Sequence, residues 1–464
     1  MYTLYQKELA PLVKIYKDID RRGILVDTAK RDELISKYLM YFEANLKVLR
    51  GFTGDDKFNP NSPAQVGALV YEILKYPKRS KISDTGRHGY KTDKDTLDDL
   101  IINSPEKCNN PRLGPQILAR IITCRKLGKV LEYLSTPLHP DGRFRCSYNL
   151  AGTETGRTSA SKTIDECILT IKDGTTRLGR SFQTLTKHGF HVDEDIFDDI
   201  ESATIAHDIR SIFIPSDGYV FMEMDGSQAE ARVVAVLAED WILLDTFDLP
   251  PKLHARTAAQ IFDDITAEEI TKNLPVIPGL GIAYYDMGKR VRHAGNYDMG
   301  PFRLAQMTHL GLGSCEIKMQ RFHAANSNTR EVFHREIREA LHLPRRELVT
   351  PLGRRRRFFE RLSEKVYKKG FAQIPQSTIS DHTKFTMRRV LEDFDEVRFL
   401  AEMHDGLMAE VPKDQIEEVS KSFRKHYERI IDFSGCTLSR DYKLVIPCEI
   451  EYSSTSWMEM KELD

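Results

Sequence analysis

One stretch near the carboxyl end constrains the fold more than any other, RFLAEMHDGLMAEVP at residues 398–412. Its two apolar runs meet at Asp405-Gly406, and Asp-Gly between alternating apolar residues is a strong signal for a tight β-hairpin. Such a dipeptide most often serves only as a surface turn. Here His404 stands beside the aspartate, and the flanking runs are too apolar for an exposed ribbon. Asp405 is therefore a candidate ligand as well as a turn residue.

A second apolar segment leads to another aspartate. In VFMEMDGSQAEAR (220–232), alternating apolar residues predict a buried strand that ends at Asp225, and a helix is expected from about Gln228. A carboxylate at such a place costs several kcal/mol unless it is paired or bound to a metal. An aspartate can also cap a helix, so this segment taken alone leaves both interpretations open.

Taken together, Asp225 and Asp405 predict a metal centre. If the hairpin lies beside the first strand, the two side chains converge at one sheet edge, where they repel each other unless a cation bridges them. Two divalent ions about 3.5–4 Å apart stabilise the attacking and leaving oxygens of an in-line phosphoryl displacement. Oxygen ligands favour Mg²⁺, which takes further ligands from substrate phosphates. We therefore expect two Mg²⁺ ions, for which Mn²⁺ could substitute.

A third stretch, YYDMGKRVRHAGNYDMGP (284–301), is expected to form a helix. Lys289, His293 and Tyr297 are spaced i, i+4, i+8 and so share one face. A cation, an imidazole and a phenol in a row can hold a triphosphate, contact a sugar and stack near a base. The alternative is an ordinary amphipathic helix whose long cations lie along its surface. Two glycines within the helix weaken it, which we interpret as a sign against a purely structural role.

Other elements are indicated by helix and turn signals. The apolar periodicity at the start of the chain predicts a helix that stops at Gly23, and Ser62 with Pro63 predicts the start of another helix. Residues 75–95 are polar and basic and are expected to form a long exposed loop. Residues 162–180 are expected to contain an extra hairpin.

The composition describes a globular protein. Of 464 residues, 41% are hydrophobic and 30% are charged. The sequence has no run of about eighteen apolar residues, the length that a membrane-spanning helix needs. The seven cysteines are scattered, which argues for reduced thiols in the cytoplasm and against structural zinc. The net charge is −1, so any face that binds nucleic acid must come from local clusters of basic residues. Taken alone, each such cluster is more often an ordinary solvent-exposed surface. The clusters are KYPKRSK (75–81), KRVRH (289–293) and GRRRRFFERL (353–362).

With AGTETGRTSAS (151–161), these stretches resemble the motifs of the bacterial DNA polymerase I family (family A). The family's patterns are, in order, R-x-G-x-x-x-D, F-N-x-x-S, T-G-R-x-S-S, L-Q-N-I-P, D-Y-S-Q-I-E-L-R, D-I-H-R-x-T-A and V-H-D-E-L. The similar stretches here are DRRGILVD (20–27), FNPNS (58–62), TGRTSA (155–160), FQTLT (182–186), DGSQAEAR (225–232), KLHARTA (252–258) and MHDGL (403–407). Each motif is short, but the ordered set covers nearly the whole chain and is specific.

The resemblance implies an α+β right-hand polymerase fold, with an antiparallel palm sheet, helical fingers and a helical thumb. It implies a thumb at 1–142 with a basic tip near 75–94, fingers at 246–370, and a palm in two parts at 143–245 and 371–464. Family members usually carry a 3′–5′ exonuclease domain ahead of the thumb. We therefore expect no proofreading from this chain, and a separate exonuclease or processivity factor as a partner. The divergent motifs suggest a phage enzyme in the cytoplasm of a bacterial host.

The resemblance also implies residue roles. Asp225 and Asp405 would hold the two Mg²⁺ ions, with the Gly226 carbonyl as a backbone ligand. Glu230 would be the steric gate against a 2′-hydroxyl, and Lys289 would act on the leaving pyrophosphate. The implied dNTP-binding residues are Gln228, Glu230, His254, Lys289, His293 and Tyr297. The implied primer–template contacts are Arg157, Arg232, Gln376 (in IPQSTISD, similar to P-M-Q-G-T-A-A-D) and His404.

The finger helix fits the family pattern R-x-x-x-K-x-x-x-[FY]-x-x-x-Y-G in two registers. With Tyr297 at the last tyrosine, Lys289 takes the lysine position, His293 the aromatic position, and Tyr285 stands where arginine is expected. A shifted register puts His293 at the lysine and Tyr297 at the aromatic position. We prefer the first register because it keeps a cation of high pKa where pyrophosphate leaves.

Other departures concern single positions. Gly226 replaces a tyrosine, but a metal needs only its carbonyl. Gly406 replaces a glutamate and removes a third carboxylate, although the two aspartates suffice. Arg290 or Arg292 could compensate for the arginine that is missing at residue 285.

The implied function is DNA-directed DNA synthesis. The primer 3′-oxygen attacks the α-phosphorus of a dNTP, and pyrophosphate leaves. A single-subunit RNA polymerase shares this logic, but a gate carboxylate at Glu230 would exclude NTPs. A two-metal nuclease fits less well because no D-x-E exonuclease set is present. A non-catalytic primer–template binding module remains as a different class, against which the intact aspartate pair speaks.

Overall fold

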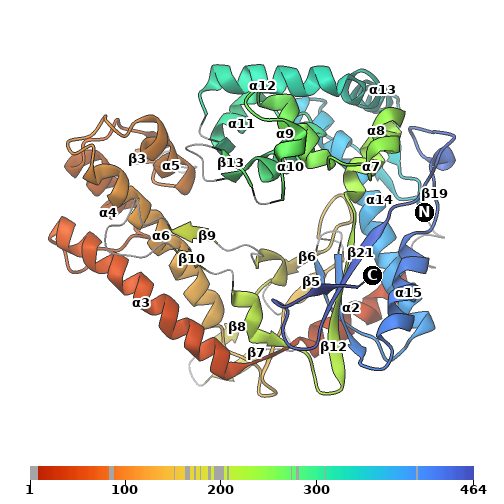
Figure 1. Ribbon diagram of the computed structural model, residues 1–464, viewed down its shortest axis with the longest axis horizontal. Coiled ribbons are helices and arrows are strands. Elements are labelled where there is room, and N and C mark those ends of the chain that lie inside the picture. The colour runs from red at the N-terminus through yellow and green to blue at the C-terminus, as the bar shows by residue number, and fades with distance from the viewer. Residues whose placement is uncertain are drawn as a thin grey trace.

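The computed structural model describes residues 9–463, apart from some short segments. The segments that it does not describe are 83–87, 151, 162–167, 172–173, 178, 186–189, 193–202, 206–207, 273, 278–281, 309 and 404–405. An amino-terminal helical arm lies on one side of the molecule, a second group of helices lies above, and a sheet with its covering helices joins them (Figure 1).

The amino-terminal arm is built from helices whose starts follow capping rules. Asp27 caps one helix by accepting a hydrogen bond from the Lys30 amide at 2.9 Å, and Ser62 precedes Pro63 at another start, as predicted. The first helix ends at Gly23, which has a φ of +62°. The elements are α2 (Ala10–Arg22), β1 (Ile24–Val26), α3 (Thr28–Thr53), α4 (Pro63–Gly67), η2 (Ala68–Ile73), α5 (Lys94–Asn103) and α6 (Leu113–Leu134).

The prediction of a long exposed loop at 75–95 is wrong in part. Strands β2 (Ser80–Ile82) and β3 (His88–Tyr90) pair within it, and Tyr76 and Thr92 are buried. Tyr76 belongs to a separate apolar core that packs the outer halves of α3 and α6 against α5 and η2. This core makes the arm a unit with its own hydrophobic interior.

The central sheet contains the predicted hairpin. Its strands are, in spatial order, β17 (Arg398–Met403), β18 (Gly406–Pro412), β12 (Tyr219–Gly226), β21 (Cys448–Ser453) and β22 (Lys461–Glu462), and every pair is antiparallel. The hairpin strand β18 lies directly beside β12, with Tyr219 opposite Pro412 and Asp225 opposite Gly406. The expected neighbourhood of hairpin and first strand is therefore confirmed.

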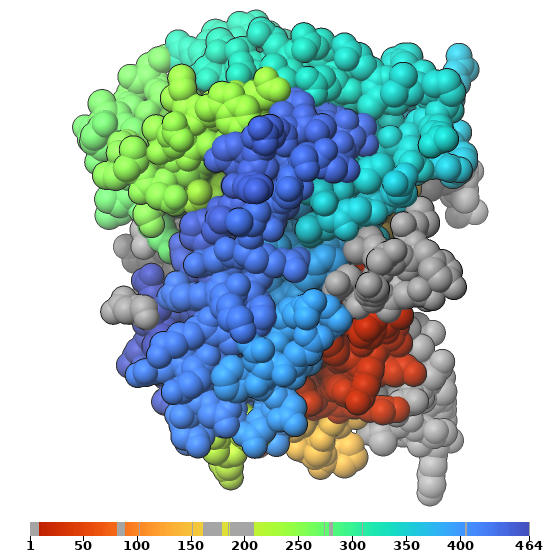
Figure 2. Space-filling model, turned by 90° about the vertical axis from the view of Figure 1, so that its right-hand side faces the viewer, coloured from red at the N-terminus to blue at the C-terminus, as the bar shows by residue number. Residues whose placement is uncertain are grey.

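Several helices share the main core with this sheet, and three of them come from the middle and the end of the chain. They are α7 (Ala229–Leu237), α14 (Glu364–Asp393) and α15 (Ile416–Tyr427). Every residue of β18 is buried, including Glu410, whose carboxylate accepts hydrogen bonds from the amide and the hydroxyl of Ser216 at 2.8 and 2.6 Å. In the side view, the carboxyl-terminal segment in blue covers the middle of the molecule and reaches the upper helices (Figure 2). There, Arg440 forms ion pairs with Glu239 and Glu336 at 2.9 and 2.7 Å.

The upper helices surround a third apolar core. The elements of this region are α8 (Trp241–Thr246), α9 (Leu253–Ile261), η5 (Ala267–Glu269), β13 (Val276–Ile277), β14 (Ile282–Ala283), α10 (Tyr284–Gly295), α11 (Pro301–Thr308), α12 (Leu312–Ala325), η6 (Thr329–His334), α13 (Arg335–His342), β15 (Glu347–Val349) and β16 (Arg355–Arg357). Phe333 and Ile337 pack into the main core instead, so the base of this group is continuous with the central part of the molecule.

The glycines of α10 correct one of our interpretations. A Cβ atom at Gly288 would lie 2.0 Å from the carbonyl oxygen of His254, and one at Gly295 would lie 2.2 Å from a ring carbon of Phe322. Both glycines therefore allow α10 to approach α9 and α12 closely. They have a packing role, and the idea that they speak against a structural role is wrong.

Short elements connect the arm to the sheet. They are β4 (Arg143–Phe144), β5 (Ser147–Asn149), β6 (Ser159–Ser161), β7 (Ile168–Ile171), β8 (Gly174–Arg177), η3 (Phe182–Thr184), β9 (Phe190–Val192), β10 (Ala203–Ile205), η4 (Ile209–Ile212), β11 (Phe213–Ile214), and later β19 (Ile431–Asp432), η7 (Phe433–Gly435) and β20 (Lys443–Leu444). Strands β7 and β8 pair, which confirms the predicted extra hairpin. No helix in the described part of the chain combines the length and the apolar character that crossing a membrane requires.

Candidate active site

Asp225 lies exposed at the end of a strand that is otherwise mostly buried. Met224 and Gly226 on either side are buried, because alternate residues of β12 face the core. On the other side of β12, Asp225 is opposite Glu449 of β21, which is also exposed. Directly opposite residues share a face of an antiparallel sheet. A second carboxylate thus stands beside Asp225. Burial, and then the negative charges of Glu449 and Asp286, raise the pKa of Tyr285 on α10.

His404 and Asp405 lie outside the described residues. The residues that flank them, Met403 and Gly406, are opposite each other, and Gly406 is opposite Asp225. Apart from that undescribed pair, no group of three or more His, Cys, Asp or Glu side chains suited to a metal is found in the described segments. The donors that this sheet edge does offer are carboxylate and backbone oxygens, which fit Mg²⁺.

Gly226 stands where the family motif has tyrosine, and the structure gives a reason. A Cβ atom at residue 226 would lie 1.9 Å from the hydroxyl oxygen of Tyr427 on α15. The space beside the backbone of Gly226 is therefore already filled by another tyrosine. A side chain at residue 226 would require the Tyr427 ring to move.

Glu230 gathers three of the other predicted residues. Its buried carboxylate, in the first turn of α7, forms an ion pair with Arg157 and accepts a hydrogen bond from the Tyr297 hydroxyl. The imidazole of His293 lies 3.8 Å from the same carboxylate and meets the Tyr297 ring edge to face, with 5.5 Å between the ring centroids. The end of α10, the turn between β12 and α7, and the loop at 152–158, called here the T-G-R loop, thus meet at one buried carboxylate.

His254 and Lys289 form a second group on the same helices. The His254 ring meets Tyr285 edge to face, with 5.3 Å between centroids. Burial, and then the cations around it, chiefly Lys289, lower the pKa of His254 to about 3. The imidazole is therefore neutral at pH 7, next to an exposed Lys289 on α10.

Arg292 does not replace the missing arginine. It is 2% exposed, donates hydrogen bonds to Thr257 at 3.1 Å and Asn326 at 2.6 Å, and its guanidinium lies over the Phe322 ring. Burial lowers its pKa to about 10. Arg292 therefore braces α10 against α9 and α12, and the suggestion that it compensates at residue 285 is wrong.

The T-G-R loop is held from α14 by buried polar side chains. Ser377 donates to the carbonyl oxygen of Thr155 at 2.6 Å, and Ser380 donates to that of Gly156 at 2.9 Å. The buried ammonium group of Lys384 donates to the same Gly156 oxygen. These bonds explain why α14 carries so many buried polar residues.

Arg354 closes the other side of the loop. Gly156 has a φ of +80°, and a Cβ atom there would lie 2.5 to 2.8 Å from the Arg354 guanidinium. That guanidinium forms two hydrogen bonds with Asp381, at 2.9 and 2.7 Å. Hydrogen bonds to its backbone and packing thus fix Gly156. The Arg157 side chain, which follows it, is directed at Glu230.

Gln183, from the FQTLT stretch, links the loop to the hairpin. Its amide donates to the carbonyl oxygens of Thr158 and Glu402, both at 3.3 Å. The Glu402 carboxylate is buried and accepts hydrogen bonds from Thr158 at 2.6 Å and from Tyr16. Tyr16 and Thr158 therefore supply hydrogen bonds to the Glu402 carboxylate, two positions before the undescribed His404.

The remaining predicted residues are not brought to Glu230. Arg232 is buried, donates to the Ser227 carbonyl at 3.0 Å and forms an ion pair with Asp248, so it supports the turn after Asp225. Gln228 has a left-handed backbone, with φ at +52°, and its side-chain oxygen is buried. Gln376 is half-buried on α14.

Most of the arginines in the basic cluster at 353–362 already pair with carboxylates of this chain. Arg355 and Arg357 both pair with Glu347 across the β15–β16 hairpin, at 2.9 and 3.0 Å. Arg356 pairs with Glu154 of the T-G-R loop at 2.6 Å. The cluster therefore holds protein together at least as much as it offers charge to a ligand.

Sequence analysis missed several residues of this site. Glu449 lies in a segment that read only as a strand, and nothing local in the sequence shows which strand it pairs with. Lys384 and Asp381 sit in a long helix where charged residues are usually exposed. Their burial depends on partners in the T-G-R loop and on Arg354, which are distant in the chain, so the local sequence carries no signal for it.

Comparisons with known proteins agree with one another. DNA polymerase I of Geobacillus stearothermophilus is 24% identical over 97% of this chain and 45% of its own length. The thermostable DNA polymerase I of Thermus aquaticus is 23% identical over 99% of this chain and 49% of its own length. The chain thus spans about half the length of the curated relatives it matches.

A solved structure and a family model complete the comparison. The POL domain of Pol1 from M. smegmatis, solved in complex with DNA primer-template and dNTP, superposes with a TM-score of 0.75 at 21% identity, over 98% of this chain and 71% of that one. The fold is therefore the expected α+β right hand of a polymerase domain. The model of DNA polymerase family A matches residues 31–459, and the chain belongs to this family.

Proposed function

We propose that this chain is a DNA-directed DNA polymerase that extends a primer 3′ end with dNTPs and releases pyrophosphate. The observation that carries the proposal is the meeting of Arg157, His293 and Tyr297 at the Glu230 carboxylate, one turn after the strand that ends at Asp225. Family membership and the likeness to a domain solved with primer-template and dNTP support it.

The metal centre belongs to this proposal. Polymerases of family A generally use divalent metal ions, and we propose two Mg²⁺ ions held by Asp225, Asp405 and the Gly226 carbonyl. The antiparallel pairing of Met403 with Gly406 and of Gly406 with Asp225 supports the convergence. When bound, such ions make the primer 3′-oxygen a better nucleophile and neutralise the leaving pyrophosphate.

Glu230 acts as the gate in this proposal. Its carboxylate is buried and held by two partners, so it cannot swing aside without breaking an ion pair and a hydrogen bond. A 2′-hydroxyl placed against it would meet a fixed side chain. We therefore favour dNTPs over NTPs, and this choice separates the chain from a single-subunit RNA polymerase.

The contact of Tyr297 with Glu230 supports the first register of the finger helix. In that register Lys289 faces the nucleotide phosphates, and its proximity to His254 is in keeping with a shared polyphosphate site. Arg157, Gln376 and His404 would contact primer–template DNA.

The division into thumb, palm and fingers remains a proposal with structural support. Separate apolar cores lie within 46–124 and within 255–322, and the largest core joins residues from both ends of the chain. The boundaries 1–142, 143–245, 246–370 and 371–464 are compatible with these cores. We also propose an intracellular location, since all six described cysteines are free thiols.

Primer extension by the purified chain tests the proposal. We expect Mg²⁺-dependent extension with dNTPs and at least tenfold slower use of NTPs. Asp225→Ala should lower the extension rate on the order of a thousandfold while leaving primer–template binding largely unchanged. The matched control is Asp217→Ala, an exposed aspartate at the other end of β12. Extension that survives in the Asp225 variant would contradict the metal assignment.

A further inference from the structure

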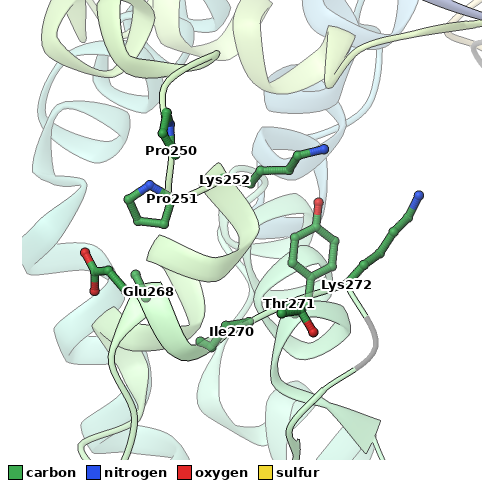
Figure 3. A pocket seen from close by; sticks show the side chains of 9 residues that line it. Pro250, Pro251, Lys252, Glu268, Ile270, Thr271 and Lys272 are labelled. Carbon is green, nitrogen blue, oxygen red and sulfur yellow. The ribbon is translucent and has the colours of Figure 1, made fainter.

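A pocket of about 590 Å³ opens beside the first turn of α10. Its walls come from the residues just ahead of α9, from η5 and the segment after it, and from Tyr285 of α10. The amino groups of Lys252 and Lys272 extend to one side of the pocket, and the carboxylate of Glu268 lies on the opposite side (Figure 3). The pocket is within the size range of small-ligand sites, and one side of it is cationic.

Tyr285 connects this pocket to the proposed nucleotide site. The tyrosine lines the pocket, and its ring packs edge to face on His254. His254 in turn lies within electrostatic reach of Lys289 and of Lys252. Lys252 of the pocket and Lys289 of α10 therefore both lie near one neutral imidazole.

Two departures from the family motifs meet in this pocket. Tyr285 stands where the finger-helix pattern has arginine, and Lys252 stands where the pattern D-I-H-R-x-T-A has aspartate. The sequence alone shows these as unrelated changes 33 positions apart, whereas the structure lines one pocket with both. Relative to the family patterns, this chain lacks a positive charge at residue 285. At residue 252 it has a positive charge in place of a negative one. Arg292 does not supply the missing charge, because it is buried among Thr257, Asn326 and Phe322.

We infer that Lys252, assisted by Lys272, binds a polyphosphate: the terminal phosphates of the incoming nucleotide or the pyrophosphate that leaves. The inference rests on the proposed function and names the residues that replace the arginine of the family. Lysine suits the role because its ammonium group is a compact charge on a flexible stem, which follows a phosphate that moves during the reaction.

Kinetics of substituted chains test this inference. The variants are Lys252→Ala, Lys272→Ala and the double variant, and the control is Lys421→Gln, an exposed lysine on α15. Primer extension gives KM and kcat for dNTP, and the reverse reaction gives KM for pyrophosphate. We expect Lys252→Ala to raise KM on the order of tenfold, Lys272→Ala to raise it less, and kcat to change less than KM. Adding Tyr285→Arg to Lys252→Ala should recover most of the loss.

The two directions of reaction identify the source of the phosphates. An increase in KM for both dNTP and pyrophosphate assigns the lysines to the terminal phosphates of the nucleotide. An increase for pyrophosphate alone assigns them to the leaving group. If the double variant keeps both KM values within twofold of the unsubstituted chain, the inference is overturned.

A binding measurement separates this inference from the proposed function. Titration of tripolyphosphate into the full chain without primer should show weaker binding to the double variant, again on the order of tenfold or more. If the unsubstituted chain extends no primer yet shows this difference, the polymerase proposal fails and the pocket assignment stands. If it extends primer but the double variant binds tripolyphosphate equally well, the pocket assignment fails alone.

Discussion

At the scale of single residues, the site is organised by Glu230. A buried carboxylate is tolerated only when partners compensate its charge, and Arg157 and Tyr297 do so from two other parts of the chain. Each partner therefore both stabilises Glu230 and is placed by it. Removing one partner should change how rigidly Glu230, the proposed gate, is held more than it changes the overall fold.

Tyr297→Phe tests this directly. The substitution keeps the ring and removes only the hydroxyl that donates to Glu230. We expect the preference for a dNTP over the matching NTP, measured as a ratio of kcat/KM values, to fall by about threefold to tenfold. Tyr41→Phe on α3 is the control. An unchanged ratio would mean that the hydroxyl does not hold the gate.

At the scale of elements, close approach decides the positions of the finger helices. α10 can lie against α9 only because residue 288 lacks a side chain. Gly288→Ala should therefore destabilise the chain by about 1–3 kcal/mol, as measured by urea unfolding. Gly313→Ala on α12 is the matched control, because a Cβ atom there would meet no neighbouring group within 4 Å and alanine favours the helix. Equal stability of the two variants would show that α9 and α10 separate without cost.

The clamp between α14 and the T-G-R loop is the second element-scale device. Asp381 is fully buried and carries two hydrogen bonds from Arg354. Asp381→Asn leaves the guanidinium without its counter-charge and should cost about 3–5 kcal/mol of unfolding free energy. Replacing both residues, as Arg354→Met with Asp381→Leu, should cost less than the single change. A single variant as stable as the original would show that the pair contributes nothing.

How far the sequence predicted these elements depends on the range of the interactions. The β17–β18 hairpin and the helix start at Ser62 follow from local turn and capping chemistry, and both were predicted. The pairing of Glu449 with Asp225 joins segments 224 positions apart in the chain and has no local signal. The role of Gly288 was misjudged because helix propensity is a local quantity, whereas its neighbour is the backbone of another helix. Asp405, His404 and a phage origin stay predictions.

At the scale of the whole molecule, buried histidines make stability depend on pH. Burial, and then the nearby Arg429, lower the pKa of His382 to about 3, against an ordinary value near 6.5. The unfolded chain therefore takes up the proton first as the pH falls below about 6.5, and folding stability falls with it down to the folded pKa. His254, His323 and His334 have depressed pKa values as well.

We expect the unfolding free energy to decrease between pH 7 and pH 5, with about 2 kcal/mol of the loss from His382. Urea unfolding at both pH values measures it. His382→Gln, which does not titrate, should show a smaller loss by that amount. An identical pH dependence in the two proteins would mean that His382 carries its proton in the folded chain.

The position of β21 has a consequence for the strand that carries Asp225. β12 is an interior strand only because residues 448–453 return to pair with it, after most of the chain has been laid down. A chain that stopped short of Cys448 would leave that side of β12 as a row of unsatisfied amide and carbonyl groups, open to a strand from another molecule. The last residues thus cover an edge of β12, and truncation ahead of them should favour aggregation of the chain.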